Sequence, residues 1–378
     1  MHEIGIRPKK SRHLVKIIVF TVFLTIATIV LIKLFNLEKI VFKGPATVVQ
    51  LITNTGLASD NGRVNVLVLG IGGQGHDGPN LSDTMILASI DKEGKDVALV
   101  SIPRDLWTPS VSAKINSVYA YGQGKNQQGL SLAVKTVGEL FGLPVHYAIR
   151  VDFNGFIKAI DLVGGLDVNV ENSFTDSKYP IAGKEDDTCG LVVETQEING
   201  IAETIVKDAT GSATVVTEEN DPFTCRYKTI SFTKGLTHMD GITALKFVRS
   251  RHGTNNEGSD FARSARQQSV ILAFRQKVLS TQTFLDPKTI IDLVSTFGNS
   301  IDTNITSEEV PYFLKLGQKI DSSVIRRIVL DQGRDDSVLE VGDLASHGGQ
   351  FVLIPKNNSY QDLADYVQGE IFKLQEKN

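Results

Sequence analysis

Three short apolar stretches decide the fold of this 378-residue chain: VNVLVLG at residues 64–70, TMILASI at 84–90 and VALVSI at 97–102. Runs of this length that are rich in Val, Ile and Leu are typical of strands buried on both faces of a sheet. Further strands are expected at 146–151 and 166–170. Helical segments lie between them, which predicts an α/β fold with three layers, α/β/α, around a central mixed sheet.

The expected helices have recognisable ends. Segment 130–141 stops at Gly142 and Pro144, and segment 153–163 is closed by two glycines. The second half of the chain predicts more helices, at 239–250, 260–280, 286–297, 306–319 and 359–374. It also predicts strands at 325–330 and 351–354.

Residues 176–228 interrupt this pattern. They are polar, rich in Asp, Glu, Thr and Gly, and they contain both cysteines of the chain, Cys189 and Cys225. We interpret them as an insertion, a loop with a β-hairpin, after which a strand at 230–232 returns to the core.

The N-terminus predicts a membrane anchor. The apolar run 17–32 is bounded by Lys16 and Lys33, and its extension to 14–35 reaches the ~20 residues that cross a bilayer. The residues before it are basic, so the chain is expected to have a cytoplasmic tail (1–13), a transmembrane helix (14–35), a linker (36–62) and an extracytoplasmic domain (63–378). The alternative is a cleaved signal peptide, but no small-x-small cleavage site follows the run.

Two properties follow from this location and from the composition. Outside the cytoplasm, Cys189 and Cys225 are expected to form a disulfide, with two unpaired thiols as the alternative. The net charge of −4 and the 22% of charged residues are ordinary for a globular protein and argue against a nucleic-acid partner, which usually requires a basic surface.

Several clusters of polar residues follow strands or helices. The glycine-rich segment 70–78 lacks both the dinucleotide fingerprint and the Gly-Lys-Ser/Thr of a phosphate-binding loop, so it is either a flexible loop or a border of the site. Asp83 stands at a strand start, where a carboxylate holds a metal or caps a turn. Arg104, beside Asp105, offers a planar fork to phosphate oxygens, with Lys114 and Asn116 a few residues later.

The second half adds more arginines. Arg249 and Arg251 repel each other unless an anion lies between them. On a helix, Asp260, Arg263 and either Arg266 or Gln267 share one face. Each cluster alone is also consistent with a solvated surface ion pair. Together they supply guanidinium groups and carboxylates that suit a pyrophosphate and its divalent cation, because phosphoryl transfer needs mainly positioning and charge stabilisation.

The ordered set of these motifs resembles the LytR–CpsA–Psr family over about 64–280. The matching segments are 69–70, 82–87 (SDTMIL), 101–105 (SIPRD), 114–116 (KIN), 163–168 (VGGLDV), 235–241 (GLTHMDG), 244–251 (ALKFVRSR) and 260–268 (DFARSARQQ). The resemblance implies a sheet flanked by helices around an apolar tunnel for a polyprenyl tail. It also implies a membrane-anchored phosphotransferase that moves a glycopolymer from a polyprenyl-pyrophosphate lipid to a peptidoglycan sugar.

The resemblance also assigns roles to residues. Arg104, Arg249 and Arg251 would grip the pyrophosphate, supported by Lys114, Asn116, Arg263 and Gln267. Asp83 would hold Mg²⁺ or Mn²⁺. Asp105 and Asp260 would orient arginines, or one of them would act as the base.

The chain departs from the family pattern at one position. A carboxylate usually follows two residues after the first Leu-Gly, and here that position is Gly72, for which Asp77 is the expected substitute. Two alternatives therefore remain open: a lipid-pyrophosphate hydrolase, and a non-enzymatic regulator that binds envelope lipids.

Overall fold

The computed structural model describes residues 56–76, 78–198, 201–207, 212–217, 220–279, 300–306, 308–332 and 337–373. The expected transmembrane helix 14–35, most of the linker, the expected helix 286–297 and Asp77 lie outside these residues. No helix within the described ranges has the length and apolarity needed to span a bilayer. The description below concerns the larger of two compact units, Ala58–Asn304 with Lys315–Asn378.

The centre of this unit is a six-stranded mixed sheet in the order β14-β6-β1-β2-β3-β15. β1 runs antiparallel to β2 and parallel to β6, and β3 runs antiparallel to β2 and parallel to β15. The six strands are β1 (Arg63–Ile71), β2 (Ser82–Asp91), β3 (Val97–Ser101), β6 (Tyr147–Asp152), β14 (Ile301–Thr303) and β15 (Ile325–Val329).

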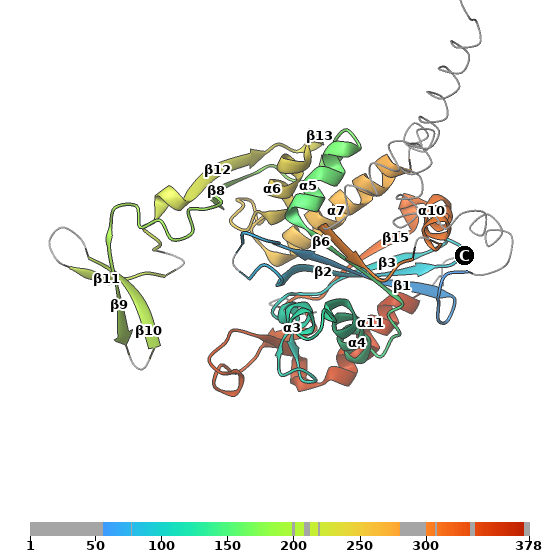
Figure 1. Ribbon diagram of the computed structural model, residues 1–378, viewed down its shortest axis with the longest axis horizontal. Helices are drawn as coiled ribbons and strands as arrows, with labels where there is room; N and C mark the ends of the chain where they lie inside the picture. Colours follow the sequence, from blue (N-terminus) through green and yellow to red (C-terminus); the bar gives the residue numbers. More distant parts are fainter. Residues whose placement is uncertain are drawn as a thin grey trace, which may run out of the picture. The chain divides into compact units, whose positions relative to one another are not determined.

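Helices cover both faces of this sheet (Figure 1). On one face, Leu67, Leu69 and Leu87 pack against α3 (Val118–Gly124), α4 (Gly129–Phe141) and α11 (Tyr360–Phe372). On the other face lie α5 (Phe153–Leu162), α6 (Gly241–Arg249) and α7 (Asp260–Val278). The predicted three-layer α/β/α arrangement with a mixed central sheet is therefore confirmed.

The helices on the second face begin at side-chain caps. The carboxylate of Asp152 accepts from the backbone N–H of Gly155 (2.7 Å), and that of Asp240 accepts from Thr243 (2.7 Å). Ser259 caps α7 by accepting from Ala262 at 3.2 Å. Such caps satisfy backbone donors that would otherwise lack a partner, so they fix where each helix starts. Their positions place the first turns of α5 and α7 beside the ends of β6, β1 and β2.

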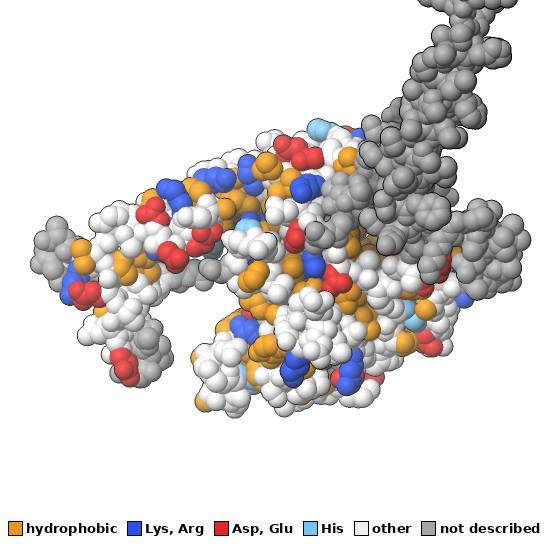
Figure 2. All heavy atoms as spheres, viewed as in Figure 1, with side chains coloured by type: hydrophobic (Ala, Val, Ile, Leu, Met, Phe, Trp, Pro, Cys, Tyr) orange, Lys and Arg blue, Asp and Glu red, His pale blue; other side chains and the backbone are white. Residues whose placement is uncertain are grey.

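The insertion forms more than a hairpin. Its flanks are β8 (Phe174–Pro180) and β12 (Tyr227–Phe232), which pair antiparallel as a two-stranded ribbon. Beyond the ribbon is a three-stranded sheet of β9 (Val192–Ile198), β10 (Ile201–Lys207) and β11 (Ala213–Val215). Cys189 and Cys225 form the expected disulfide. Lys and Arg side chains gather along the ribbon (Figure 2).

Three expected strands are present, but their pairing could not be read from the sequence. The expected strand 230–232 belongs to β12 and brings Phe232 to the core as expected; its partner is β8. β7 (Leu166–Val170) has the expected bounds and pairs with β13 (Gly235–Met239), which was not expected and directly precedes α6, the helix expected at 239–250. The expected strand 351–354 is β17 (Leu353–Pro355), which pairs with β16 (Leu339–Val341).

Smaller differences concern element ends and short elements. α10 (Val310–Lys319) begins four residues later than the expected helix 306–319. The short hairpin of β4 (Trp107–Thr108) and β5 (Ala113–Lys114) was not expected, nor were α3 and β14. Two- and three-residue strands and a helix containing two glycines carry no periodic signal that a sequence pattern can detect.

Candidate active site

A cavity of about 560 Å³ lies between the sheet and helices α5, α6 and α7. Its body is apolar, with side chains from β6, α5, α6, α7 and β14: Ile149, Val151, Phe156, Ile160, Leu245, Val248, Val270, Ile271, Phe274 and Ile301. Its polar lining includes Asp83, Arg249, Arg251, Arg263 and Gln267. One cavity thus combines an apolar interior with several cationic groups. This is the arrangement that an amphiphilic anion requires.

The polar part of the lining continues into a network of ion pairs. Asp83 Oδ1 accepts a hydrogen bond from Arg104 Nη1 at 2.9 Å and lies 3.7 Å from Arg251 Nη2. Arg104 Nε is 3.4 Å from Asp105 Oδ2, whose other oxygen accepts from Lys114 Nζ at 2.8 Å. Arg104, Asp105 and Lys114 do not line the cavity itself; they join it through Asp83. The structure therefore brings Asp83, at the start of β2, and the charged residues that follow β3 into one cluster with Arg251.

Helix α7 contributes the second half of the cluster. Arg263 Nη2 is 2.7 Å from Asp260 Oδ1, one turn earlier on the helix. Gln267 Nε2 donates to Thr84 Oγ1 at 2.9 Å, which attaches α7 to β2 next to Asp83. Of the two residues that the sequence left open for this helical face, Gln267 lines the cavity and Arg266 does not.

The charges in this cluster are unbalanced around Arg251. Burial, together with the nearby charges of Arg263 and Arg104, lowers the pKa of Arg251 to about 10, although Asp83 and Asp260 oppose this shift. For Arg104, burial also lowers the pKa, but the hydrogen bond to Asp83 and the charge of Asp105 more than offset it, and the pKa is raised. An arginine whose charge is disfavoured by its surroundings marks a position where an anion would be stabilised.

Arg249 is held by aromatic rings. Its guanidinium carbon lies 4.3 Å from the ring centroid of Phe153, at the start of α5, and 5.9 Å from that of Tyr179, on β8. Cation–π contacts of this kind hold the guanidinium beside the two rings, where its charge can still attract an oxyanion. Arg249 thus faces the same cavity as Arg251 from the insertion side.

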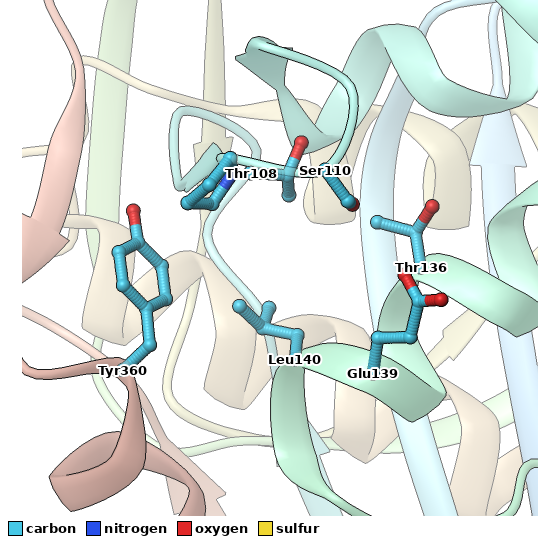
Figure 3. Close-up of a pocket in the computed structure, with 7 residues that line it drawn as sticks. Thr108, Ser110, Thr136, Glu139, Leu140 and Tyr360 are labelled. Atoms are coloured by element: carbon cyan, nitrogen blue, oxygen red, sulfur yellow. The ribbon is translucent and has the colours of Figure 1, made fainter.

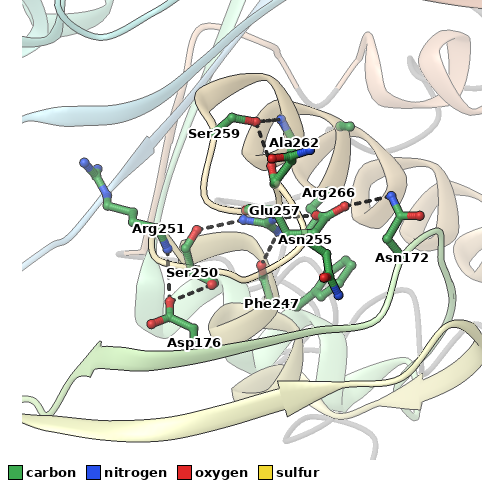
Figure 4. Close-up of polar contacts among 12 residues, drawn as sticks. Asn172, Asp176, Phe247, Ser250, Arg251, Asn255, Glu257, Ser259, Ala262 and Arg266 are labelled. Carbon is green, nitrogen blue, oxygen red and sulfur yellow. Dashed lines mark hydrogen bonds and ion pairs between the residues drawn. The ribbon is translucent and has the colours of Figure 1, made fainter.

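A buried polar framework holds the loop that carries these arginines (Figure 4). Asp176, only 1% exposed, accepts from the hydroxyl of Ser250 at 2.6 Å and from the backbone N–H groups of Arg251 and His252, both at 3.2 Å. In Figure 4 the guanidinium of Arg251 points away from Asp176. The carboxylate therefore fixes the backbone of Arg251 and leaves its side chain free to reach the cavity.

Arg266 holds the same loop through an ion pair and hydrogen bonds. It is 4% exposed, pairs with Glu257 at 2.6 Å and donates to the carbonyls of Phe247 (2.9 Å) and Ser250 (2.7 Å). One guanidinium thus ties the end of α6 to the loop before α7. Neither Asp176 nor Arg266 was assigned a role in the sequence analysis. The sequence does not indicate that a carboxylate at the start of a polar insertion is buried. The same is true of a second arginine in a helical motif.

Asn116 does not join the site as expected. Its backbone N–H donates to the carbonyl of Arg104 at 3.2 Å, but it is not among the residues that line the cavity. Its contribution is to close the loop 104–116 behind Arg104.

The carboxylates present fit a Mg²⁺ ion that is shared with a phosphate ligand. Mg²⁺ is usually held by one or two carboxylates, with phosphate oxygens and waters completing its coordination. Asp83 on β2 and Asp152 at the end of β6 both line the cavity, on either side of the end of β1. At Gly72 a Cβ would lie 3.0 Å from the Cβ of His76, so the loop packs closely where the family pattern places a carboxylate.

Comparisons with known proteins identify relatives of this chain. The chain is 25% identical over 312 residues to the polyisoprenyl-teichoic acid–peptidoglycan teichoic acid transferase TagU of Bacillus cereus, covering 82% of this chain and 79% of that protein. It is 27% identical over 261 residues to the protein of that name from Oceanobacillus iheyensis, covering 68% and 64% of the two chains. The crystal structure of B. subtilis TagV superimposes with a TM-score of 0.53 at 20% identity, covering 84% of this chain and all of that one, which shows the shared fold.

Residues 41–341 match the model of the LytR_cpsA_psr family. This match spans the central sheet, the cavity, the arginine cluster and the insertion. The chain therefore belongs to the LytR–CpsA–Psr family.

Proposed function

We propose that this protein is a phosphotransferase that moves a glycopolymer from a polyprenyl-pyrophosphate carrier to a sugar hydroxyl of peptidoglycan. The observation that carries the proposal is the single cavity in which an apolar body meets an arginine cluster. A polyprenyl chain is a branched hydrocarbon that gains by leaving water, and its pyrophosphate requires several cationic donors. The names of the TagU relatives support this choice of donor and acceptor.

The reaction would proceed as an in-line displacement at phosphorus. The oxygen of the acceptor hydroxyl forms a bond to the phosphorus that carries the glycan, and the bond from that phosphorus to the lipid phosphate oxygen breaks. The products are a phosphodiester and polyprenyl phosphate. Arg104, Arg249 and Arg251 hold the phosphate oxygens as negative charge shifts towards the leaving group, which is the main contribution that a protein makes to such a step.

The hydroxyl proton passes to a carboxylate of the cluster. Asp105 is held between Arg104 and Lys114, and Asp260 is held by Arg263. Either one lies within the ion-pair network that surrounds the phosphate. Asp105→Asn and Asp260→Asn separate the two roles, since the variant that lacks the base loses turnover while it keeps its affinity for the donor.

A divalent cation is part of the proposal. Asp83 and Asp152 would hold Mg²⁺ or Mn²⁺, and Asp77, outside the described residues, stays the substitute predicted for Gly72. When bound, the ion would neutralise charge on the pyrophosphate. We expect Asp83→Asn to weaken Mn²⁺ binding measured by electron paramagnetic resonance, independently of activity.

The location is also proposed. The apolar run 14–35 with basic residues before it favours an anchor with a cytoplasmic N-terminus and an extracytoplasmic site. The Cys189–Cys225 bond is consistent with an oxidising compartment. Protease digestion of intact spheroplasts would cleave the domain if this orientation is right, and would leave it intact if the domain faces the cytoplasm.

The decisive experiment measures turnover by the full chain in detergent. The donor is a short polyprenyl-pyrophosphate disaccharide, and the acceptor is a peptide-free peptidoglycan glycan strand, with Mg²⁺ present. We expect acceptor-dependent release of polyprenyl phosphate. Arg104→Ala should lower kcat/KM by about 100-fold or more, as the loss of one preorganised donor does elsewhere. Arg327→Ala, which removes an exposed arginine paired with Glu171, serves as the matched control and should change little.

Three other results would each contradict the proposal. Release of lipid phosphate that does not depend on the acceptor would indicate a hydrolase. Donor binding without turnover would indicate an envelope-lipid-binding regulator. No binding of the donor would remove the cavity from consideration altogether.

A further inference from the structure

A second cavity lies on the opposite face of the sheet, beside α4 and α11. It has a volume of about 230 Å³ and is lined by Thr108, Pro109, Ser110, Thr136, Glu139, Leu140 and Tyr360. Figure 3 shows the side chains of Tyr360, Leu140 and Glu139 around a central space, with Thr108 and Ser110 opposite them. The volume is below the ~300–1,000 Å³ of pockets for drug-sized ligands, so it suits a single ring.

The lining has the chemistry of a sugar site. Hydroxyl groups come from three different segments, and Glu139 adds a half-exposed carboxylate that pairs with Lys135 at 3.7 Å. The hydroxyl of Thr108 donates to the carbonyl of Ala113 (2.8 Å) and that of Tyr360 to the carbonyl of Trp107, so both oxygens can still accept a hydrogen bond from a sugar hydroxyl. Pro109, Leu140 and the ring of Tyr360 supply apolar surface for the C–H face of a pyranose. No arginine is part of the lining, which disfavours a phosphate.

An aromatic pair adjoins this cavity. The partly exposed Trp107 precedes Thr108, and its carbonyl accepts from the hydroxyl of Tyr360 at 3.0 Å. His347 packs edge-on against the indole, with ring centroids 4.7 Å apart. The loop around His347 also exposes Leu344 and Phe351, at 52% and 46%. Together these residues extend the small cavity into an aromatic surface over which a longer glycan can lie.

This surface is connected to the arginine cluster through one short hairpin. Trp107 is paired with Lys114 across β4 and β5, and Lys114 Nζ bonds to Asp105. The backbone N–H of Leu353, at the end of the loop that holds His347, donates to the carbonyl of Asp105 at 2.9 Å. Asp105 thus contacts the arginine cluster through its side chain and the loop that holds His347 through its carbonyl.

We propose that the second cavity, with Trp107 and His347, is a subsite for the acceptor glycan. It would hold a sugar unit near the one whose hydroxyl reacts, so that the strand crosses Asp105 on its way to the phosphate. This inference rests on the proposed function, which requires a saccharide acceptor in addition to the lipid donor. The acceptor needs a separate site, because the apolar body of the donor cavity suits the lipid.

The test uses Trp107 as a probe, since it is the only tryptophan of the chain. The full chain in detergent is titrated with peptide-free peptidoglycan tetrasaccharide, without donor, and tryptophan fluorescence is recorded. We expect a saturable change. Ser110→Phe, which fills the cavity from an exposed loop, should weaken binding at least about tenfold, equivalent to roughly 1.4 kcal/mol. Ser131→Phe, on the exposed surface of α4 outside the lining, is the matched control and should bind normally.

The outcomes separate this inference from the proposed function. A saturable signal that is weakened by Ser110→Phe alone supports the subsite, even if no transfer from a lipid donor is ever observed. No signal, or equal binding by both variants, overturns the subsite. If the transfer assay then shows normal KM for the acceptor in Ser110→Phe, the proposed function stands and the subsite is refuted.

Discussion

Arg251 carries a positive charge that its surroundings in the folded protein disfavour. It lies among Arg104 and Arg263, with Asp83 at 3.7 Å as its closest carboxylate. In the folded protein the charged form is disfavoured, since its pKa falls from the usual 12.5 to about 10. This destabilisation is present at every pH below about 10 and is relieved as the pH rises from 10 towards 12.5. An arginine that lowers the stability of the protein without a bound anion is explained if its function is to bind one.

The first prediction concerns Arg251→Gln. We expect the variant to melt at a slightly higher temperature than the unmodified chain when no anion is present. Its affinity for inorganic pyrophosphate should fall roughly 10- to 100-fold, the loss of about 1.5–3 kcal/mol that removal of a charged hydrogen bond causes. Calorimetric titration and thermal melts measure both effects. A variant that is less stable and binds pyrophosphate normally would show that Arg251 is a structural ion-pair partner.

The same pKa predicts a pH dependence. Arg251 stays charged between pH 6 and 9, so sulfate affinity should be nearly constant there and should fall as the pH rises through about 10. Sulfate is the appropriate ligand because its own charge does not change over this range. In Arg251→Gln the fall near pH 10 should be absent, and its persistence would assign the titration to another group.

Asp176 allows a prediction about positioning. Its replacement by Ala leaves the part-buried N–H groups of Arg251 and His252 and the buried hydroxyl of Ser250 without this acceptor, and the buried hydroxyl alone costs about 1–3 kcal/mol. Asp176→Ala should therefore weaken pyrophosphate binding, and Asp176→Asn should restore most of it, because the amide oxygen still accepts. Asp96→Ala is the control: it breaks a buried pair with Arg63 and Arg326 before β3, whereas Arg104 follows that strand.

The control separates two explanations. If Asp96→Ala and Asp176→Ala lower both stability and pyrophosphate affinity to the same degree, Asp176 acts only through stability. If affinity falls in Asp176→Ala alone, the carboxylate positions the arginine loop.

At the scale of helices and strands, the sequence predicts the elements that have a recognisable pattern of apolar residues. The strands β1, β2 and β3 and the helices α4 and α5 have long apolar patterns, and their expected and observed bounds differ by at most two residues. The strand at 166–170 was also placed correctly, but its pairing with β13 could not be predicted, because pairing is decided by contacts between distant segments. Among the site residues, Arg104, Arg251, Arg263 and Gln267 follow from motifs. Asp176 and Arg266 do not, because only the fold reveals that they are buried.

The insertion gives a prediction at this scale. The Cys189–Cys225 bond closes a loop with a sequence separation of 36 residues. On loop-entropy grounds such a closure contributes about 3–4 kcal/mol. The bond lies wholly within the insertion, so we expect the double variant Cys189→Ser, Cys225→Ser to lose amide-exchange protection in β9 and β10.

The central sheet provides the reference for that measurement. Protection in β1 and β2 should stay unchanged, because their hydrogen bonds do not involve the insertion. Loss of protection there as well would show that the domain and the insertion unfold as one unit.

For the whole molecule, the central sheet separates two cavities of different character. One combines apolar side chains with arginines, and the other combines hydroxyls with the aromatic ring of Tyr360. The loop 104–116 has contacts towards both: Arg104 pairs with Asp83 of the first cavity, and Thr108, Pro109 and Ser110 line the second. A transferase that takes one substrate from a lipid and the other from a polysaccharide needs two such environments, because no single surface desolvates a hydrocarbon and hydrogen-bonds a sugar equally well.

The apolar cavity should therefore distinguish donors by the length of their lipid. Ile271, on α7, lines its body, and Ile271→Trp would narrow it while leaving the arginines in place. Overpacking of this kind costs about 1–3 kcal/mol of stability, which the thermal melt of the variant would reveal. We expect the KM for a donor of ten or more isoprene units to rise, while the KM for a two-unit donor stays unchanged. If both donors are affected equally, the lipid tail does not occupy this cavity, and the arginine cluster would have to bind its phosphate with the tail left in the membrane.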